Sequence, residues 1–193
     1  MAPARPYHHG DLRRAVLDAA IDVIAEAGPA AISLRDLARR AGVSHAAPAH
    51  HFGDKAGLLT AIAAEGQELL ADRLHEAHRR SGGDFLEVGV AYVRFAVEHR
   101  AHFEIMYRPE LHRPDDPAVI AGRTRAGAVL YRGASERGPG RSADEVRTAG
   151  LAAWSLVHGF ATLWIHGALP EGLGDDPEAA ARTVARHLGV SPG

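Results

Sequence analysis

The chain has 193 residues, 46% of them hydrophobic, which is enough for one sizeable core or for a small domain beside a larger one. It contains no cysteine, which excludes disulfides and thiolate metal sites and favours a reducing compartment. Its formal net charge of −2 does not by itself indicate a nucleic-acid-binding protein.

A short arm, residues 1–10, precedes the first predicted helix, and Arg5 is its only charged side chain. The N-terminus lacks the apolar segment of a secretory signal, and no apolar run approaches the ~20 residues that span a bilayer. We therefore expect a soluble, cytoplasmic protein with no membrane partner. From Asp11 to Ala27 apolar residues recur at helical spacing, and Gly28-Pro29 ends this helix.

Residues 33–55 predict two short helices joined by a turn and followed directly by a longer helix. The apolar stripe of the first short helix consists of Leu34, Leu37, Ala38 and Ala41. Ser33 is a suitable N-cap, with Asp36 three residues later. Gly42 suits the left-handed residue that ends a helix, and Ser44 is expected to cap the second helix. This layout is typical of a DNA-binding helix-turn-helix, although many helical hairpins share it.

Helical periodicity continues through the rest of the chain. A long helix is predicted from about residue 54 to residue 80, and later helices around residues 85–95, 103–107, 118–137, 142–167 and 177–188. Arg108–Pro117 contains three prolines and is expected to be a loop. The sequence therefore predicts an all-α protein of about nine helices. We expect an N-terminal arm and three-helix bundle, residues 1–53, and a larger helical domain, residues 54–193, linked by the long helix.

Two segments resemble the TetR family of transcriptional regulators. The stronger is AGVSHAAPAHHFGDKAGLL, residues 41–59, which follows a capped helix at a similar distance from the N-terminus. The residues that carry this likeness are Ala41, Gly42, Val43, Ser44, His51, Phe52, Lys55, Leu58 and Leu59. The weaker match is Trp154, His158 and Gly159, which resemble the Trp-His-Gly signature of one class of TetR regulatory domain.

The resemblance implies a homodimer that binds a double-stranded DNA operator through two N-terminal domains. It also implies dimerisation through the last two long helices and a small-molecule effector that shifts the spacing of the DNA-reading heads. The implied DNA contacts are Ser33 and Arg35 near phosphates, Ser44, His45, Ala46 and Ala47 facing the major groove, His50 near the backbone and Lys55 on a phosphate.

The sequence departs from the family pattern at two positions in the second short helix. Ala49 stands where the family usually has a tyrosine that contacts the DNA backbone, and Pro48 replaces an apolar residue. With Ser44 as N-cap, Pro48 would remove the first internal hydrogen bond, and it biases Ala47 away from helical angles. We therefore expect this helix to start late or to be tightened in its first turn.

Aromatic and apolar side chains of the second domain are candidates for an effector pocket. They are Phe85, Tyr92, Phe95, Phe103, Met106, Tyr107, Trp154 and His158. At helical spacing, ordinary core is the first explanation for such residues. For His158, a satisfied core or interface histidine is favoured over a polar contact in an apolar pocket.

No motif indicates an enzyme, a cofactor or a metal site. The chain lacks a Gly-x-Ser-x-Gly, a phosphate loop and a His-Glu-x-x-His, and its thirteen histidines have no ligand set of recognised spacing. We expect a DNA-binding transcriptional regulator, a repressor released from its operator by a small molecule. The alternative is a helical small-molecule-binding protein or enzyme that has lost DNA binding, with Pro48 and Ala49 as signs of decay.

Overall fold

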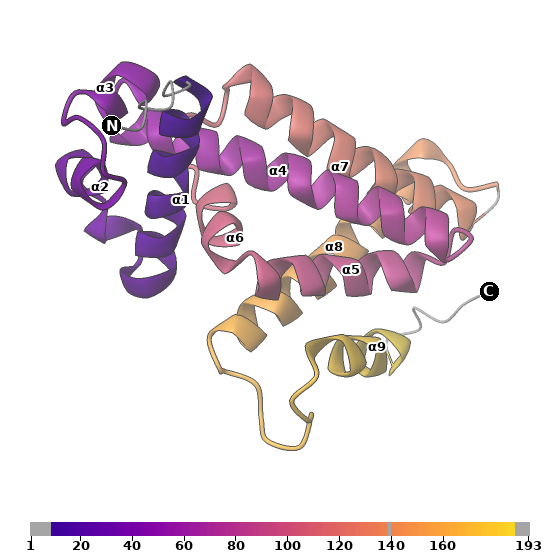
Figure 1. Cartoon of the computed structure of the whole chain (residues 1–193). Helices are drawn as coiled ribbons and strands as arrows, with labels where there is room; N and C mark the ends of the chain where they lie inside the picture. The colour runs from indigo at the N-terminus through magenta and orange to yellow at the C-terminus, as the bar shows by residue number, and fades with distance from the viewer. Residues whose placement is uncertain (1–8, 139, 188–193) are drawn as a thin grey trace. The chain divides into compact units, whose positions relative to one another are not determined.

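The computed structural model describes residues 9–138 and 140–187, and this part of the chain consists of helices joined by loops (Figure 1). The described residues form nine α-helices and one 3₁₀ turn without a β-strand, which confirms the predicted fold class. Internal contacts divide the chain into two compact units. The first contains the residues up to Glu65 together with Ala101–Asp116, and the second contains Gly66–Arg100 and the residues from Pro117 onward. The predicted functional boundary after residue 53 stays a prediction.

The first unit is built on helix α1 (His9–Ala27), which packs against α2 (Leu34–Arg40) and α3 (Ala47–Phe52). Helix α1 begins two residues before the predicted cap, Asp11, and the rest of the predicted arm, with Arg5, lies outside the described residues. The 3₁₀ turn η1 (Pro29–Ala31) follows α1 and contacts it. Most of the apolar positions that the periodicity marked lie in the core of this unit, whereas Leu34 and Ala41 of the predicted stripe are only half-buried. The buried positions include Val16, Ile24, Leu37, Ala38, Leu58, Leu59, Ile62 and Ile105.

Helix α4 (Lys55–Arg80) contributes its first turns to the first unit and its remainder to the second. Helix α6 (Arg100–Met106) starts three residues earlier than predicted and lies almost entirely in the first unit. The loop that follows, residues 107–116, begins and ends one residue earlier than predicted, because α6 ends at Met106 and Pro117 opens α7 (Pro117–Glu136). Proline suits this first helical position, where its missing N–H has no partner to lose.

In the second unit, α5 (Phe85–Glu98) packs against both α8 (Ala143–Ile165) and α9 (Pro177–His187), and α7 packs against α8. Helix α8 begins with a capping box, because the Ser142 hydroxyl accepts the Glu145 N–H while the Glu145 carboxylate accepts the Ser142 N–H. Contrary to the expectation from apolar runs, α8 is by length and composition a candidate membrane span. Core helices of soluble proteins pass the same test, so this alone is weak support.

Candidate nucleic-acid interface

The local signals around α2 are present as the sequence predicts. The Ser33 hydroxyl accepts the backbone N–H of Asp36 at 3.4 Å and so caps the helix. At the other end Gly42 has φ +66°, which a residue with a side chain rarely adopts. The Val43 N–H then donates to the Ala38 carbonyl at 3.0 Å, a Schellman arrangement that turns the chain toward α3.

Helix α3 does not begin at Ser44, so the predicted cap at Ser44 is wrong. The N-cap is Ala46, whose side chain makes no capping bond, and Pro48 occupies the first helical turn. Because proline has no N–H to donate, it is tolerated in the first turn and not further inside, so the helix begins beside it. The Ala47 N–H instead donates to the Ser44 carbonyl at 3.0 Å and closes a turn. The late start expected from Pro48 is confirmed.

The late start changes which predicted groove contacts are available. Ser44, His45 and Ala46 are exposed in the turn before α3, and His50 is exposed on the helix itself. Ala47 is 8% exposed and belongs to the core, as do Pro48 and Phe52. Ala47 therefore drops out of the set facing a major groove, because its methyl group packs inward.

The two predicted phosphate contacts with positive charge lie at the starts of helices. Arg35 is exposed in the first turn of α2 and forms no ion pair within residues 9–138 and 140–187. Lys55 is the first residue of α4, and its Nζ donates to the Ala30 carbonyl of η1 at 3.4 Å. A long, weak bond of this kind leaves the ammonium group able to exchange its partner.

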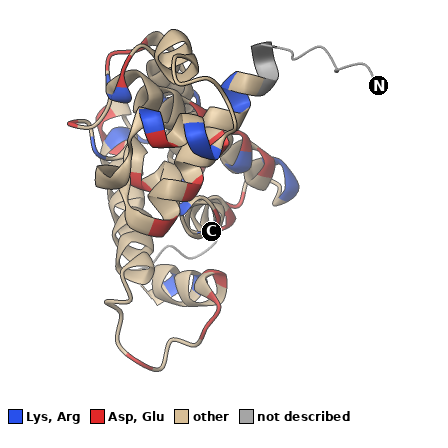
Figure 2. Cartoon of the chain, turned by 60° about the vertical axis from the view of Figure 1, so that its left-hand side comes forward, with Lys and Arg blue, Asp and Glu red and all other residues tan. Residues whose placement is uncertain are grey.

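The remaining basic groups of this unit are largely neutralised by neighbouring acids. Over the whole chain, Figure 2 shows Lys and Arg interspersed with Asp and Glu. Arg39 pairs with Asp36 at 3.2 Å, and Arg40 pairs with Glu26 at 3.3 Å. The hydrogen bond from Arg39, followed by that from Ser33, lowers the pKa of the Asp36 carboxyl. The unit therefore presents few free cations to a phosphate backbone.

The structure separates the predicted pocket residues into two groups. Phe103, Met106 and Tyr107 belong to the first unit, whereas the other five belong to the second. Phe85, Phe95, Phe103 and Met106 are buried core side chains. Tyr92, Trp154 and His158 meet in the second unit, since the indole N–H of Trp154 donates to the Tyr92 hydroxyl at 3.2 Å and that oxygen lies 2.9 Å from His158 Nδ1. Burial lowers the pKa of the His158 imidazole, which favours the neutral ring.

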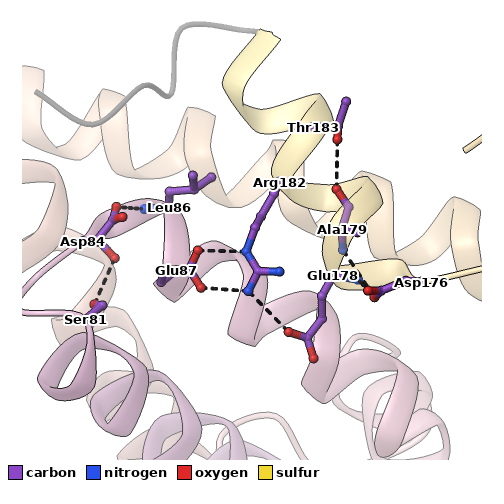
Figure 3. A network of polar contacts seen from close by, with 9 residues as sticks. All are labelled: Ser81, Asp84, Leu86, Glu87, Asp176, Glu178, Ala179, Arg182 and Thr183. Atoms are coloured by element: carbon purple, nitrogen blue, oxygen red, sulfur yellow. Dashed lines mark hydrogen bonds and ion pairs between the residues drawn. The ribbon is translucent and has the colours of Figure 1, made fainter. Parts of the chain in front are cut away.

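Ion pairs hold α9 on α5 in the second unit (Figure 3). Two nitrogens of the Arg182 guanidinium each donate to one oxygen of the Glu87 carboxylate at 2.9 Å. Glu178, one turn earlier on α9, lies 3.5 Å from both Arg182 and Arg94 of α5. The hydrogen bonds from Arg182 lower the pKa of Glu87. Sequence reasoning did not identify this contact, which joins residues 95 positions apart.

Among the described residues, no group of three or more His, Cys, Asp or Glu side chains is arranged to hold a metal ion. Sequence reasoning also missed three polar residues of the first unit, Glu65, His102 and Arg113. Their partners lie 37 to 59 residues away along the chain, so no local pattern identifies them.

A capped helix, a glycine turn and a short second helix, carried by a helical protein of two units, define a helix-turn-helix regulator. Residues 16–62 match the family model described as bacterial regulatory proteins, tetR family. Residues 85–188 match the model of the tetracyclin repressor-like C-terminal domain. The chain belongs to the TetR family and is a DNA-binding transcriptional regulator.

Similar proteins extend over nearly the full chain. The HTH-type transcriptional regulator BetI of Escherichia coli O127:H6 is 30% identical over 189 residues, with 91% of each chain covered. The BetI protein of Klebsiella pneumoniae strain 342 is 30% identical, with 81% of this chain and 82% of that protein covered. Among solved structures, a protein with unknown function from Rhodococcus sp. RHA1 is 34% identical, with a TM-score of 0.77 and 95% and 96% coverage. The TetR family regulator PfmR from Thermus thermophilus is 26% identical, with a TM-score of 0.67 and 89% and 94% coverage.

Proposed function

We propose that this regulator is a cytoplasmic homodimeric repressor, without enzymatic activity, that a small molecule releases from its operator. The observation that carries the proposal is a set of exposed residues in the helix-turn-helix. Ser44, His45 and Ala46 lie in the turn before α3, and His50 lies on α3 itself. A dimer would present two such sets about one helical turn of DNA, ~34–36 Å, or a small multiple apart. Arg35 and Lys55 would anchor each head on phosphates.

Helix α8 supports dimerisation through the last two long helices. Leu151 and Leu163 are 51% and 45% exposed, although both are large and apolar. At helical spacing they share the outward side of α8 with small residues, Ala152, Ser155 and Gly159. A Cβ added at Gly159 would meet nothing within 4 Å, so this stretch has room for a second helix. A second copy of α8 is the occupant we propose, because small and apolar residues let two helices approach closely.

The cluster of Tyr92, His158 and Trp154 supports an effector site in the second unit. The polar atoms of these three side chains converge between apolar helices. Convergent polar groups of this kind orient small ligands in apolar pockets. Trp154, His158 and Gly159 on one helix also favour the Trp-His-Gly class of regulatory domain. The alternative, a helical binding protein or enzyme that has lost DNA binding, is motivated only by Pro48 and Ala49, whereas the family match favours a DNA-binding regulator.

Binding to labelled duplexes from upstream of the chain's own gene, followed by fluorescence anisotropy, distinguishes the two hypotheses. We expect wild type to bind one duplex at least tenfold more tightly than unrelated DNA. His45→Ala should weaken this binding by about tenfold, because a base contact is lost. Arg35→Gln should make the slope of log K against log salt shallower by about 2 for a dimer, because two phosphate contacts are lost.

Arg132→Gln is the control, since Arg132 is an exposed arginine on α7 and should change neither the affinity nor the slope. Binding no tighter than to unrelated DNA for every upstream duplex would favour the competing hypothesis.

A further inference from the structure

The loop between α6 and α7 returns to the start of α4, directly after the recognition helix α3. One nitrogen of the Arg113 guanidinium, Nη2, donates to both carboxylate oxygens of Asp54, at 2.9 and 2.8 Å. The two residues are 59 positions apart and both belong to the first unit. This contact therefore ties a distant loop to the corner between α3 and α4.

Asp54 also caps α4. Its Oδ1 accepts the N–H of Gly57 at 2.7 Å, so the same carboxylate orders the first turn of α4 and receives Arg113. The hydrogen bond from Gly57 and, after it, the charge of Arg113 lower the pKa of Asp54. Lys55, the proposed phosphate contact, follows Asp54 directly. An ordered cap at Asp54 therefore fixes the direction in which the Lys55 side chain projects from the helix.

The main chain of the loop is anchored independently of the arginine side chain. The Arg113 N–H donates to the Thr60 hydroxyl at 2.9 Å, and that hydroxyl donates to the Ala56 carbonyl at 2.7 Å. Thr60 is only 5% exposed, so this anchor is in the core. The guanidinium thus extends from a backbone position that α4 itself sets.

Glycine at position 57 allows the three segments to meet. A Cβ added there would lie 2.0 Å from the Phe52 carbonyl oxygen and 2.9 Å from Arg113 Nη1. Phe52 is the last residue of α3, so the end of α3 and the guanidinium both lie within 3 Å of the space that a side chain at position 57 would fill. A displacement of Arg113 or of the first turn of α4 would therefore shift the end of α3, the recognition helix.

We propose that Arg113 is a positioning residue for operator binding, which holds the corner between α3 and α4 without touching DNA. The role rests on the proposed function, because it matters only when the helix-turn-helix binds an operator. Loss of the side chain would leave the core anchor at Thr60 intact but free the Asp54 cap and Lys55 to move.

The test compares Arg113→Gln with Arg108→Gln, an exposed arginine nearby that pairs instead with Glu104 and Glu110. Operator affinity is measured by anisotropy across a salt series, beside hydrogen exchange of the free protein. We expect Arg113→Gln to bind about tenfold more weakly, roughly threefold for each head of a dimer, as loss of an exposed ion pair allows. The salt slope should stay unchanged, and exchange should quicken at the first turn of α4. Arg108→Gln should match wild type in all three.

Asp54→Asn separates positioning from charge, because asparagine still caps a helix but cannot hold the guanidinium as an ion pair. We expect Asp54→Asn and the double variant to bind as weakly as Arg113→Gln. Recovery of wild-type affinity in the double variant, or a slope shallower by about 2 in Arg113→Gln, would show that Arg113 acts through charge on the DNA and would overturn the proposal.

Unchanged affinity and exchange in Arg113→Gln would overturn the proposal as well. If wild type itself binds no operator, the proposed function fails and this role fails with it. If wild type binds and Arg113→Gln binds equally, only the role of Arg113 fails.

Discussion

Glu65, on α4, shows how one half-buried carboxylate joins three helices of the first unit. Its Oε2 accepts a hydrogen bond from Arg14 of α1 at 2.6 Å, and its Oε1 lies 3.1 Å from Nε2 of His102 on α6. His102 is 5% exposed, so its ring has little access to water in place of Glu65. Burial by itself raises the pKa of Glu65, but the bonds from Arg14 and His102 outweigh it, and the pKa is lowered below 4.5.

Glu65→Gln should therefore destabilise the protein near neutral pH. Because the folded pKa is lowered, the stabilisation is present above the unfolded value and is lost as pH falls through the folded value. We expect the free energy of unfolding in urea to drop by about 1–2 kcal/mol at pH 7 and the gap to wild type to close below pH 4.5. Glu76→Gln, whose carboxylate pairs with exposed arginines on the same helix, should have little effect. A gap that stays constant down to pH 3.5 would contradict the assignment.

His158 is a second group whose burial makes the stability of the protein depend on pH. Its pKa is lowered by burial, so the unfolded chain takes up a proton here before the folded one as pH falls below about 6.5. His158→Asn keeps an acceptor toward the Tyr92 hydroxyl but cannot be protonated. We expect the melting temperature of wild type to fall more than that of the variant between pH 7.5 and 5. His166→Asn, on an exposed residue beyond the end of α8, should follow wild type, and parallel curves for all three proteins would refute this.

At the scale of elements, α7 approaches α4 closely at Gly122. A Cβ at Gly122 would lie 2.7 Å from the Gln67 Cβ and 3.1 Å from its carbonyl carbon. Glycine at this position thus sets how closely the two helices pack in the second unit. Arg125, on the same helix, spans to Asp72 at 2.7 Å and pairs with Glu68, which aligns the helices along their length.

Gly122→Ala should therefore destabilise by about 1–3 kcal/mol, because the methyl group forces the backbones apart. Gly127→Ala is the matched control five residues further on α7, where an added Cβ meets only the Tyr131 ring at 3.8 Å. Alanine has the higher helix propensity, so this variant should gain about 0.5–1 kcal/mol. Urea unfolding at one protein concentration measures both, and changes of the same sign would show that packing at residue 122 does not decide the outcome.

At the scale of the whole molecule, the exposed side of α8 decides whether the proposed regulator exists as a dimer. Leu163→Glu places a charge on that side and should yield monomers in size-exclusion chromatography with light scattering. Operator affinity should fall more than tenfold, because each monomer carries one head. If the Leu163→Glu variant is still dimeric, the interface does not include this side of α8.

The sequence by itself determined the features that depend on neighbours within about four residues. Ser33, Gly42 and the Ser142–Glu145 pair act through local backbone bonds, so their caps and turns follow from residue type and spacing. Helical periodicity likewise predicted the core, because residues three and four apart share one face of a helix. The all-α class was accessible for the same reason, whereas the family was accessible through the resemblance of residues 41–59 to the TetR pattern.

Only the tertiary structure decided which side chains of the recognition segment are available. Ala47 and Pro48 are placed in the core by packing against other helices. The Arg113–Asp54 contact spans 59 residues and the Tyr92–His158 contact spans 66. Such pairs form because separate helices bring them together, and the energy that selects them comes from burial and hydrogen bonding across the fold, which no local spacing encodes.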